Sequence, residues 1–308
     1  MTRVLAHVHT LNDADIIDGT IEALLRQTRP LDGILIVDNG STDGTLERPS
    51  LKHATVLRHP ENTGTSGAVY TGFRFALEHD YDWIWVFDAD SAPEPDALEK
   101  LLELYDGWPQ SAQNETAFLA CLHSNIQDSV PRHGGIFTRH GIDQASPQSG
   151  ERYYLCHFTI WSGVLYRLAA VQQIGLPNPK YMLDWGEGEY GYRVMKAGYK
   201  GYTCQDAILH HNIRGSLSFT PVDVNFGPFK FTLYEFSPIR LYYQSRNMVY
   251  FLLYEFEQWR PLLLLHAILG VARQVVGFLL RPRNHRKHLL ACIRGLWHGI
   301  TGNIAARY

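Results

Sequence analysis

Short apolar runs alternate with helical patterns through the first hundred residues of the chain. Strands are expected at residues 3–9, 33–37, 55–58 and 82–87, and helices at residues 16–27, 66–79 and 96–105. In the helical segments apolar residues recur every three or four positions, whereas the last of these strands is apolar on both faces. Strands of that kind, alternating with helices, are typical of a parallel sheet covered by helices. The pattern therefore predicts an α/β fold with a mostly parallel, Rossmann-like sheet.

The second half of the chain carries a weaker pattern. Residues 107–153 are rich in Gly, Pro, Ser and Gln, and we expect irregular structure there. A strand is predicted at residues 158–166 and a helix at residues 187–197, which ends at Gly198. Residues 212–240 are predicted to form loops.

From about Leu241 to its end the chain is predicted to be helical. We therefore expect two domains, a sheet-containing domain at residues 1–215 and a linker with a helical, basic region at residues 216–308. The net charge of −3 hides an asymmetry, because residues 260–308 hold eight Arg or Lys and no Asp or Glu. That leaves −11 for the rest of the chain. A basic, apolar tail on an acidic body favours contact with anionic lipid or another anionic partner, and the alternative is a tail folded onto that body.

The apolar run in the tail is too short to predict a membrane-spanning helix. Residues 261–272 are apolar except for His266, and a spanning helix needs about 20 residues. Further on, apolar residues at helical spacing lie among basic ones, which is typical of a helix in a membrane interface. The alternative is a helical cap that packs on the sheet-containing domain or on a second subunit of a homo-oligomer. The apolar positions are Leu289, Ile293, Leu296, Trp297 and Ile300, and the basic ones are Arg286, Lys287 and Arg294.

Composition narrows the class and compartment of the protein. With 308 residues, 45% hydrophobic and 19% charged, the chain is typical of a globular protein. Its four cysteines are scattered and form no CxxC pair, which argues against a disulfide framework or a zinc site. The first residues show no basic-then-apolar signal pattern. We expect a cytoplasmic protein, at the inner face of the membrane if the tail binds lipid, with no nucleic-acid partner.

Two polar loops follow predicted strands. Asp38 begins a loop, DNGSTDGT, at the end of the second strand, where a carboxylate can accept a hydrogen bond from a base imide. Asn-Gly and Asp-Gly are also ordinary turn dipeptides, so the loop alone leaves both readings open. The stretch NTGTSG, from Asn62 to Gly67, opens a helix whose backbone N–H groups suit phosphate or ribose oxygens. Asn62 or Ser66 could equally be a helix N-cap.

The third strand-end loop is Asp88-Ala89-Asp90, directly after the tryptophan-rich strand. Two carboxylates at the end of a strand that is buried on both faces have to lie in a polar crevice. A hard divalent cation, Mg²⁺ or Mn²⁺, satisfies such a pair while it also bridges a pyrophosphate. An acidic pair alone is a weak signal, and its position after this strand strengthens it.

Five ordered motifs resemble family 2 glycosyltransferases with the GT-A fold. They are TLND, ALLRQT, VDNGSTDGT, ENTGTSG and FDADSAPEPDAL, and the resemblance spans roughly residues 3–215. The longer stretch DYDWIWVFDADSAPEPDAL is similar to the bacterial rhamnosyltransferase and galactofuranosyltransferase branch. The resemblance implies inverting transfer of a sugar from a nucleotide diphosphate-sugar.

The resemblance also assigns roles to residues of the nucleotide side. Thr10, Leu11 and Asn12 would line the base pocket and Asp38 would bind the base imide. The family often has Tyr or Phe where Leu11 stands, so a stacking platform for the base is missing or supplied elsewhere. The remaining donor contacts would come from Asn62 and Gly64 near ribose and pyrophosphate, from Asp88 and Ala89, and from Ser162 and Gly163 near the donor sugar. A tight backbone approach explains Gly163 equally well.

Inverting transfer needs a base that takes the proton of the acceptor hydroxyl. Aligned on Arg193, the stretch DWGEGEYGYR resembles the family's acidic motif and offers Glu187 first, then Glu189, then Asp184. Glu189 is spaced for an ion pair with Arg193 within a helix, which is its structural alternative.

The resemblance completes the metal site with a histidine. The stretch DAILHH resembles the family's ending and places His211 beside Asp88 and Asp90 as a metal ligand, with His210 in reserve. Arg246, in YYQSRN, resembles a residue of the rhamnosyltransferase-like branch and would pair with phosphate or remain a helix-surface cation. The QxxRW motif of processive synthases is absent, because Gln244 is followed by Asn247-Met248 where the motif has Arg-Trp.

The motifs together predict a Mn²⁺- or Mg²⁺-dependent inverting glycosyltransferase of bacterial surface polysaccharide synthesis. The donor would be a UDP- or dTDP-sugar and the acceptor a hydroxyl of a glycan or a lipid-linked glycan. A nucleotidyltransferase that makes the sugar nucleotide is one alternative, but the Gly-rich, basic loop expected after its first strand is missing at residues 9–12. A non-catalytic sugar- or membrane-binding module is the other.

Overall fold

The computed structural model describes residues 2–125, 131–132, 134–138, 141–147, 150–211, 220–226, 229–257 and 286–308. The chain forms two compact units. The first, here called the sheet unit, consists of Met1–Phe137, Ile142–Pro179 and Gly186–Gly215. The second, the helical unit, consists of Thr138–Gly141, Lys180–Trp185 and Ser216–Tyr308. Each unit is described by itself.

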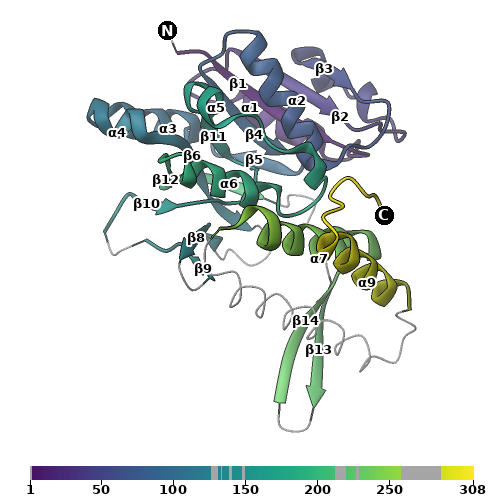
Figure 1. Ribbon diagram of the computed structural model, residues 1–308. Coiled ribbons are helices and arrows are strands. Elements are labelled where there is room, and N and C mark those ends of the chain that lie inside the picture. Colours follow the sequence, from purple (N-terminus) through teal and green to yellow (C-terminus); the bar gives the residue numbers. More distant parts are fainter. Residues whose placement is uncertain are drawn as a thin grey trace. The chain divides into compact units, whose positions relative to one another are not determined.

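A mixed sheet forms the sheet unit, and eight of its described strands follow one another in the order β10-β12-β6-β11-β4-β1-β2-β3 (Figure 1). Two short strands join it at the side, β5 on β12 and β7 on β6. The strands are β1 (Val4–Thr10), β2 (Gly33–Asp38), β3 (Thr55–Arg58), β4 (Trp83–Asp88), β5 (Ser91–Pro93), β6 (Thr116–Asn125), β7 (Pro131–Arg132), β10 (Tyr153–Cys156), β11 (Val164–Arg167) and β12 (Lys200–His211). Strands β8 (Gly135–Thr138) and β9 (Gly141–Gln144) pair separately.

Helices cover both faces of this sheet because its central strands are apolar on both sides. In β4, Trp85 and Phe87 pack with α1 and α3, whereas Ile84 and Val86 pack with α2 and α5 on the other face. Both hydrophobic cores are therefore built from alternate residues of the same strands. The helices of this unit are α1 (Ile17–Leu25), α2 (Gly64–Glu78), α3 (Ala97–Asp106), α4 (Gln110–Glu115), α5 (Leu168–Ile174) and α6 (Gly186–Lys196), with short 3₁₀ turns η1 (Thr45–Glu47) and η2 (Pro49–His53).

The predicted α/β fold with a GT-A-like sheet is confirmed, with two corrections to its strands. Residues 107–153, predicted to be irregular, contain β6, an inner strand whose apolar run 117–122 is short and flanked by polar sequence. The strand predicted at residues 158–166 begins only at Val164, because Gly163 lies before it with a φ of +76° that no strand residue adopts. Strand β11 is antiparallel to both of its neighbours, so the sheet is less parallel than expected.

The helical unit contains helix α7 (Pro238–Tyr250), which continues into the π-helical turn η4 (Phe251–Glu255), and helix α9 (Arg286–Ile300). Residues 212–240 were predicted to form loops, but β13 (Thr220–Phe226) and β14 (Phe229–Glu235) form a hairpin there. The alternation of apolar and polar residues in both strands agrees with a hairpin, and Pro221 and Pro228 obscure it. The apolar run 261–272 lies outside the described residues. Within the described part, no helix is long and apolar enough to cross a bilayer.

Candidate active site

Three strands end side by side at one edge of the sheet unit. In the parallel ladders Thr10 of β1 lies beside Asp38 of β2, and His9 of β1 lies beside Asp88 of β4. The loops after these strands therefore share one edge, which is the edge where open α/β sheets bind ligands. Two of the three polar loops picked out from the sequence begin at this edge.

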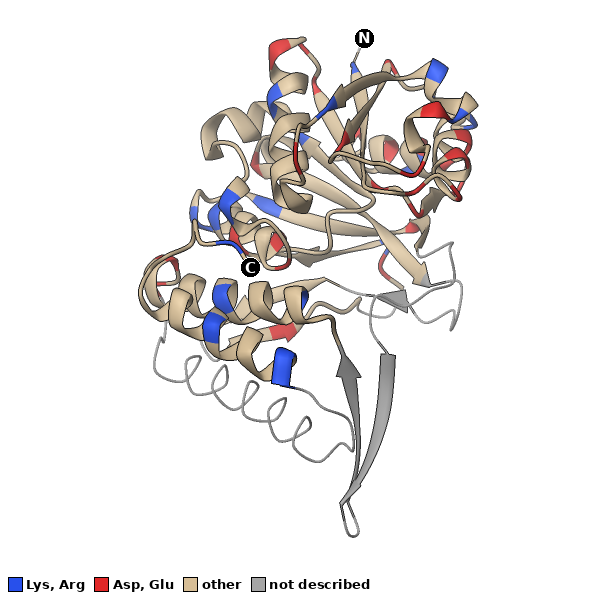
Figure 2. Ribbon diagram, turned by 90° about the vertical axis from the view of Figure 1, so that its right-hand side faces the viewer, with Lys and Arg blue, Asp and Glu red and all other residues tan. Residues whose placement is uncertain are grey.

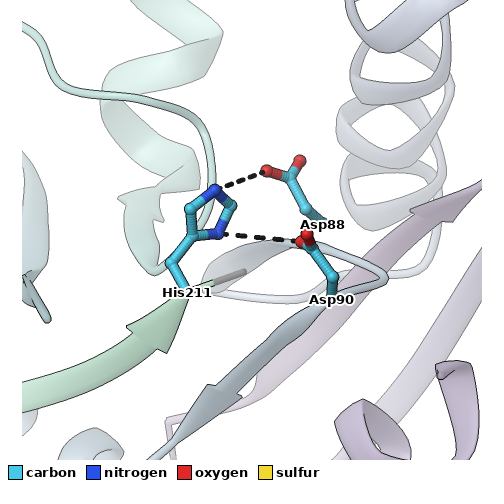
Figure 3. A group of neighbouring side chains, drawn as sticks. All are labelled: Asp88, Asp90 and His211. Carbon is cyan, nitrogen blue, oxygen red and sulfur yellow. Dashed lines mark ion pairs between the residues drawn. The ribbon is translucent and has the colours of Figure 1, made fainter. Parts of the chain in front are cut away.

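Asp88, Asp90 and His211 form a cluster at this edge (Figure 3). One ligand atom from each side chain lies within 4.8 Å of the others. His211 Nε2 is 3.9 Å from Asp88 Oδ2, and His211 Nδ1 is 3.7 Å from Asp90 Oδ1. The side chains are 32%, 27% and 27% exposed, in that order, so the cluster opens to solvent and does not face a dry interior.

Strand pairing explains how residues so distant in sequence meet. The chain turns sharply after β4 into β5, and β5 pairs with the end of β12, so that Ser91 lies opposite His211. The Ser91 hydroxyl lies 2.9 Å from His211 Nδ1. His210, the reserve candidate, points away from the cluster as alternation along a strand requires, and its Nε2 bonds to Glu94. His211 is therefore the histidine that the fold brings to the two aspartates.

The two carboxylates differ in their protonation behaviour. Burial alone would raise the pKa of Asp88, but the hydrogen bond and the charge of His9, with His211 and His123 nearby, lower it to about 2. Burial and the charge of Asp88 raise the pKa of Asp90, against the opposing effect of His211. Two neighbouring carboxylates of this kind repel each other as anions, and a cation between them relieves the repulsion.

Of the residues that support Asp88, Ser162 was singled out from the sequence, as a donor-sugar contact, whereas His9 and His123 were not. His9 Nε2 donates to Asp88 Oδ1 at 2.7 Å, and the Asp88 backbone N–H donates to the Ser162 hydroxyl at 3.1 Å. His123 of β6 lies behind His211, with their ring centroids 6.2 Å apart. A signal existed in β1, where histidines alternate in the apolar run VLAHVHT, but a histidine in a strand usually belongs to the core.

The Asp38 loop is a tight turn that its own carboxylate holds. Asp38 is fully buried and accepts hydrogen bonds from the backbone N–H groups of Gly40 and Ser41, and Arg58 forms an ion pair with it at 3.3 Å. The turn chemistry considered as an alternative is therefore present. A role for Asp38 toward a base stays a prediction, since a carboxylate has lone pairs for further donors.

The TLND stretch packs onto this loop. Asn12, in the left-handed region at φ +59°, accepts from the Thr42 N–H through its side chain, while its own N–H donates to the Ser41 hydroxyl. Thr10 is buried at the end of β1, and Leu11 is 37% exposed. The resemblance led us to expect Tyr or Phe at the position of this exposed leucine, so its role toward a base remains a prediction.

The start of helix α2 lies close to the start of helix α6. Asn62 accepts from the Gly64 N–H and so orders the turn before α2, but the N-cap of α2 is Thr63, so neither Asn62 nor Ser66 is the N-cap. A Cβ atom on Gly186, the first residue of α6, would stand 2.3 Å from Ser66 Oγ of α2, so the two helix starts approach closely. The N-terminus of α2, which lies within the NTGTSG stretch, therefore meets the N-terminus of α6 in the sheet unit.

The three candidates for the catalytic base differ in their surroundings. Glu189 is almost fully buried and forms an ion pair with Arg193, as its helical spacing predicted. Asp184, in the helical unit, is held by Arg240 through both carboxylate oxygens. Burial raises the pKa of Asp184 while Arg240 opposes that rise. Glu187 lies partly exposed in the first turn of α6.

Two further predicted donor contacts have structural explanations. Gly163 adopts a φ of +76°, and a Cβ atom there would stand 2.8 Å from Leu209, so the tight backbone approach accounts for the glycine. The neighbouring Ser162 is buried, and its hydroxyl bonds to Ser91 as well as to the Asp88 N–H.

Arg246 is 1% exposed, so the helix-surface alternative is wrong. Its guanidinium donates to the backbone carbonyls of Lys180, Tyr181 and Ala306 and to the side chain of Asn247. A phosphate would have to displace these partners, and the described contacts within the helical unit instead assign Arg246 a structural task.

The sequence profile described as "Glycosyl transferase family 2" matches residues 6–175, which is more than half of the chain. The chain belongs to glycosyl transferase family 2. The matched region contains the Asp38 loop, the NTGTSG stretch and both aspartates of the cluster, so the family and the geometry point to the same edge of the sheet.

Individual family 2 relatives are distant. The chain is 26% identical over 231 residues to the galactofuranosyltransferase GlfT1 of Mycobacterium tuberculosis, which covers 71% of this chain and 73% of that protein. It is 36% identical over 109 residues to an undecaprenyl-phosphate mannosyltransferase of Micrococcus luteus, covering 33% of this chain and 43% of that protein.

Solved structures with a similar fold include two that hold nucleotides. Residues 1–349 of S. aureus TarS, in complex with UDP-GlcNAc, align with a TM-score of 0.56 at 14% identity, over 98% of this chain and 88% of that one. GalNAc-T7 with UDP, GalNAc and Mn²⁺ aligns with a TM-score of 0.57 at 13% identity, over 68% of this chain and 44% of that one. At these identities the likeness shows the fold alone.

The donor set of this family 2 chain fits a hard divalent cation. Asp88 and Asp90 offer carboxylate oxygens and His211 offers an imidazole nitrogen. Asp88 ends β4, Asp90 lies in the turn between β4 and β5, and His211 ends β12, which pairs with β5. Carboxylates are the ligands that Mg²⁺ and Mn²⁺ prefer, and open sites with few protein ligands leave positions for substrate oxygens.

Proposed function

We propose that the chain transfers a sugar from a UDP- or dTDP-sugar to a hydroxyl group, with inversion at the anomeric carbon and with the help of Mn²⁺ or Mg²⁺. The observation that carries this proposal is the convergence of Asp88, Asp90 and His211 at the same edge of the sheet as the Asp38 loop. Family 2 membership supports sugar transfer, and the cluster supplies the site at which a diphosphate leaving group would be held.

Asp88, Asp90 and His211 would hold the cation, which neutralises charge that develops on the departing nucleoside diphosphate. The base would lie over Thr10, Leu11 and Asn12, with its imide at Asp38. Ribose and pyrophosphate would contact Asn62, Gly64 and Ala89, and Ser162 with Gly163 would border the donor sugar. Arg246 has no place in this list, since its donors are engaged elsewhere.

Glu187 is the proposed base. It would accept the proton of the acceptor hydroxyl as the oxygen attacks the anomeric carbon from the face opposite the leaving group. Its partial exposure supports this choice, because an acceptor has to reach it. Glu189 and Asp184 are less suited, since guanidinium groups already hold their carboxylates.

The acceptor is proposed to be a glycan or a lipid-linked glycan of the bacterial surface, built at the inner face of the membrane. The names of two relatives, a galactofuranosyltransferase and an undecaprenyl-phosphate mannosyltransferase, support this class. Residues 1–215 would carry out the transfer reaction. Residues 216–308 would have a separate role, either binding the membrane surface or packing against a second copy of the chain.

The alternatives are less well supported. A nucleotidyltransferase needs a Gly-rich, basic loop after β1, and the residues there, His9 to Asn12, contain neither Gly nor Arg or Lys. A non-catalytic module would have no need to keep two aspartates open to solvent beside a histidine.

The proposal is tested by incubating the full chain with UDP-, dTDP- and GDP-sugars and measuring release of the nucleoside diphosphate. We expect slow release from a UDP- or dTDP-sugar with Mn²⁺, faster release with the right acceptor, and none with a chelator or in Asp90→Asn. His210→Ala is the matched control, because that histidine lies on the same strand outside the cluster. Release that persists with chelator and in Asp90→Asn would overturn the proposed metal dependence.

A further inference from the structure

Helix α9 packs within the helical unit through its small residues. Ala291, Cys292, Gly295 and Gly299 are the buried residues of this helix. A Cβ atom on Gly295 would stand 2.4 Å from the carbonyl oxygen of Tyr242, and one on Gly299 would stand 2.7 Å from that of Arg246. The backbones of α7 and α9 therefore approach too closely for any side chain larger than hydrogen at these two positions.

The large apolar residues of α9 lie on its other side. Leu290, Ile293, Trp297 and Ile300 are 64%, 53%, 63% and 54% exposed. Their spacing of three, four and three residues places them in a single stripe. Sequence reasoning expected Leu289 and Leu296 in the apolar face, but both are only partly exposed and Leu290 takes their place. A soluble helix buries its large residues and exposes its small ones, and α9 does the reverse.

Basic residues flank this stripe. Arg286 and Lys287 lie at its beginning and Arg294 beside its middle, and all three are exposed. Figure 2 shows Lys and Arg in blue on the helices of the helical unit. No acidic residue occurs anywhere in residues 260–308. An apolar stripe with tryptophan and a purely cationic border matches the headgroup region of an anionic bilayer, which offers a negative surface above an apolar interior.

We propose that this face of α9 lies in the interface of an anionic lipid bilayer. The apolar stripe enters the headgroup boundary, and the three cations contact lipid phosphates. A second copy of this chain fits less well, because two such faces would bring like charges together. The inference goes beyond the proposed sugar transfer and does not depend on it.

The test is flotation of the full chain with lipid vesicles of phosphatidylcholine alone or with 30% phosphatidylglycerol. We expect binding to the anionic vesicles and little to the neutral ones. Ile293→Gln with Trp297→Gln should reduce binding at least tenfold, whereas Leu25→Gln, a 49%-exposed leucine of α1, should leave it unchanged. Lys287→Gln and Arg294→Gln should each cost about fivefold, the equivalent of about 1 kcal/mol per charge.

Two outcomes would overturn this inference. One is equal flotation of the wild type and of the double variant. The other is a chain that binds no vesicle but changes from dimer to monomer in sedimentation when the stripe is made polar, since a second copy would then cover it. Thermal unfolding identifies any variant that has lost its fold, and the two charge variants, which leave the core untouched, keep the proposal testable in that case.

A second inference concerns His9. Its Nε2 donates to Asp88 Oδ1 at 2.7 Å, and the two residues are neighbours in the β1–β4 ladder. The ring is 8% exposed, and it stacks on His7 at 5.8 Å between centroids. One oxygen of Asp88 is thereby occupied, and the other, Oδ2, faces His211.

We infer that His9 is a positioning residue, which turns the Asp88 carboxylate so that Oδ2 is presented to the cation. It touches neither donor nor acceptor, and its effect passes through Asp88. This inference rests on the proposed function. Groups that hydrogen-bond to ligating carboxylates typically change metal affinity 10- to 100-fold when they are removed.

Mn²⁺ binding without substrate, followed through the EPR signal of the free ion, separates this inference from the proposed function. We expect His9→Ala to weaken binding 10- to 100-fold, His9→Gln to recover most of the loss because its amide can donate, and His210→Ala to match the wild type. Equal affinity in His9→Ala and wild type would refute the role of His9 alone. A wild type that binds no Mn²⁺ would refute the metal site itself. Thermal unfolding shows whether each variant is folded.

Discussion

Two clusters of charged side chains, one in each unit of this chain, have their charges compensated in different ways. At the edge of the sheet unit, Asp88 and Asp90 are partly exposed and lie beside His211, and Asp88 also accepts from His9. In the helical unit, Asp184 is held by Arg240 through both of its oxygens, and Arg246 is buried among carbonyl groups. Motif resemblance had marked members of both clusters as functional.

The difference lies in how each charge is compensated. A buried carboxylate that a guanidinium holds in two places has its charge satisfied, and removing the partner leaves an uncompensated charge. Two carboxylates side by side have no such compensation until a cation arrives, and perturbed protonation at such places is typical of functional sites. The first arrangement stabilises a fold, and the second prepares a site for a ligand.

Glu187→Gln gives the largest expected effect. It should lower the transfer rate by about 10² to 10⁴, the usual contribution of a general base, while donor binding stays within a factor of two or so. Steady-state kinetics with the acceptor and a separate donor titration measure the two quantities. The same loss in Glu189→Gln but not in Glu187→Gln would move the base to Glu189.

Arg240→Met should act on stability. It leaves Asp184 charged and without the partner that holds it, and we expect the free energy of unfolding to fall by about 3–5 kcal/mol. Urea unfolding measures this, with Arg26→Met as the control because the ion pair of Arg26 with Glu22 is exposed. If Arg240→Met unfolds like the control and abolishes transfer, the helical unit's cluster is catalytic and the contrast fails.

Lowering the pH should reduce the stability of the folded chain through His123, which lies behind His211. Burial, with the charge of His211 nearby, lowers the pKa of His123 to about 4, against the hydrogen bond to the Ser162 carbonyl. In the unfolded chain a histidine titrates near 6.5, so the unfolded state binds the extra proton between about pH 6.5 and 4. Stability should fall through that window as the pH falls, by up to about 3 kcal/mol from this one group.

Urea unfolding of wild type and His123→Gln between pH 4.5 and 7.5 measures that effect. The variant should show a shallower decline, although the buried His7, whose pKa burial also lowers, keeps part of it. Parallel curves would show that His123 does not titrate in this way.

His210→Ala should have the smallest effect. Its bond to Glu94 is largely exposed, and such pairs contribute about 0.2–1 kcal/mol. We expect unchanged Mn²⁺ affinity and a loss of stability below about 1 kcal/mol, by titration and urea unfolding. A tenfold loss of Mn²⁺ affinity would make His210 the ligand and displace His211.

Much of the fold could be predicted from periodicity, and the failures have physical causes. Strand β4 was found because it is apolar on both faces, which few other structures explain. Strand β6 was missed because its apolar run is embedded in polar sequence, and the β13–β14 hairpin because prolines obscured its alternation. Periodicity depends only on the residues of one segment. It therefore predicts little where pairing with other segments determines the structure.

The same limit applies to the candidate site. Asp88 and Asp90 were recognised because a strand that is buried on both faces must release its terminal acids into a crevice. His9 was missed, since nothing in a single strand shows that its neighbour across the ladder is a carboxylate. Arg246 was misjudged, because burial among backbone carbonyls has no local sequence signal.

The most direct test of this account is the affinity for UDP and dTDP in the presence of Mn²⁺ or of a chelator, in the wild type and in Asp90→Asn. If the Asp88–Asp90–His211 cluster holds the cation against the diphosphate, Mn²⁺ should tighten nucleotide binding by tenfold or more in the wild type and by nothing measurable in the variant. Equal binding with Mn²⁺ and with chelator in the wild type, or an undiminished gain in Asp90→Asn, would contradict it.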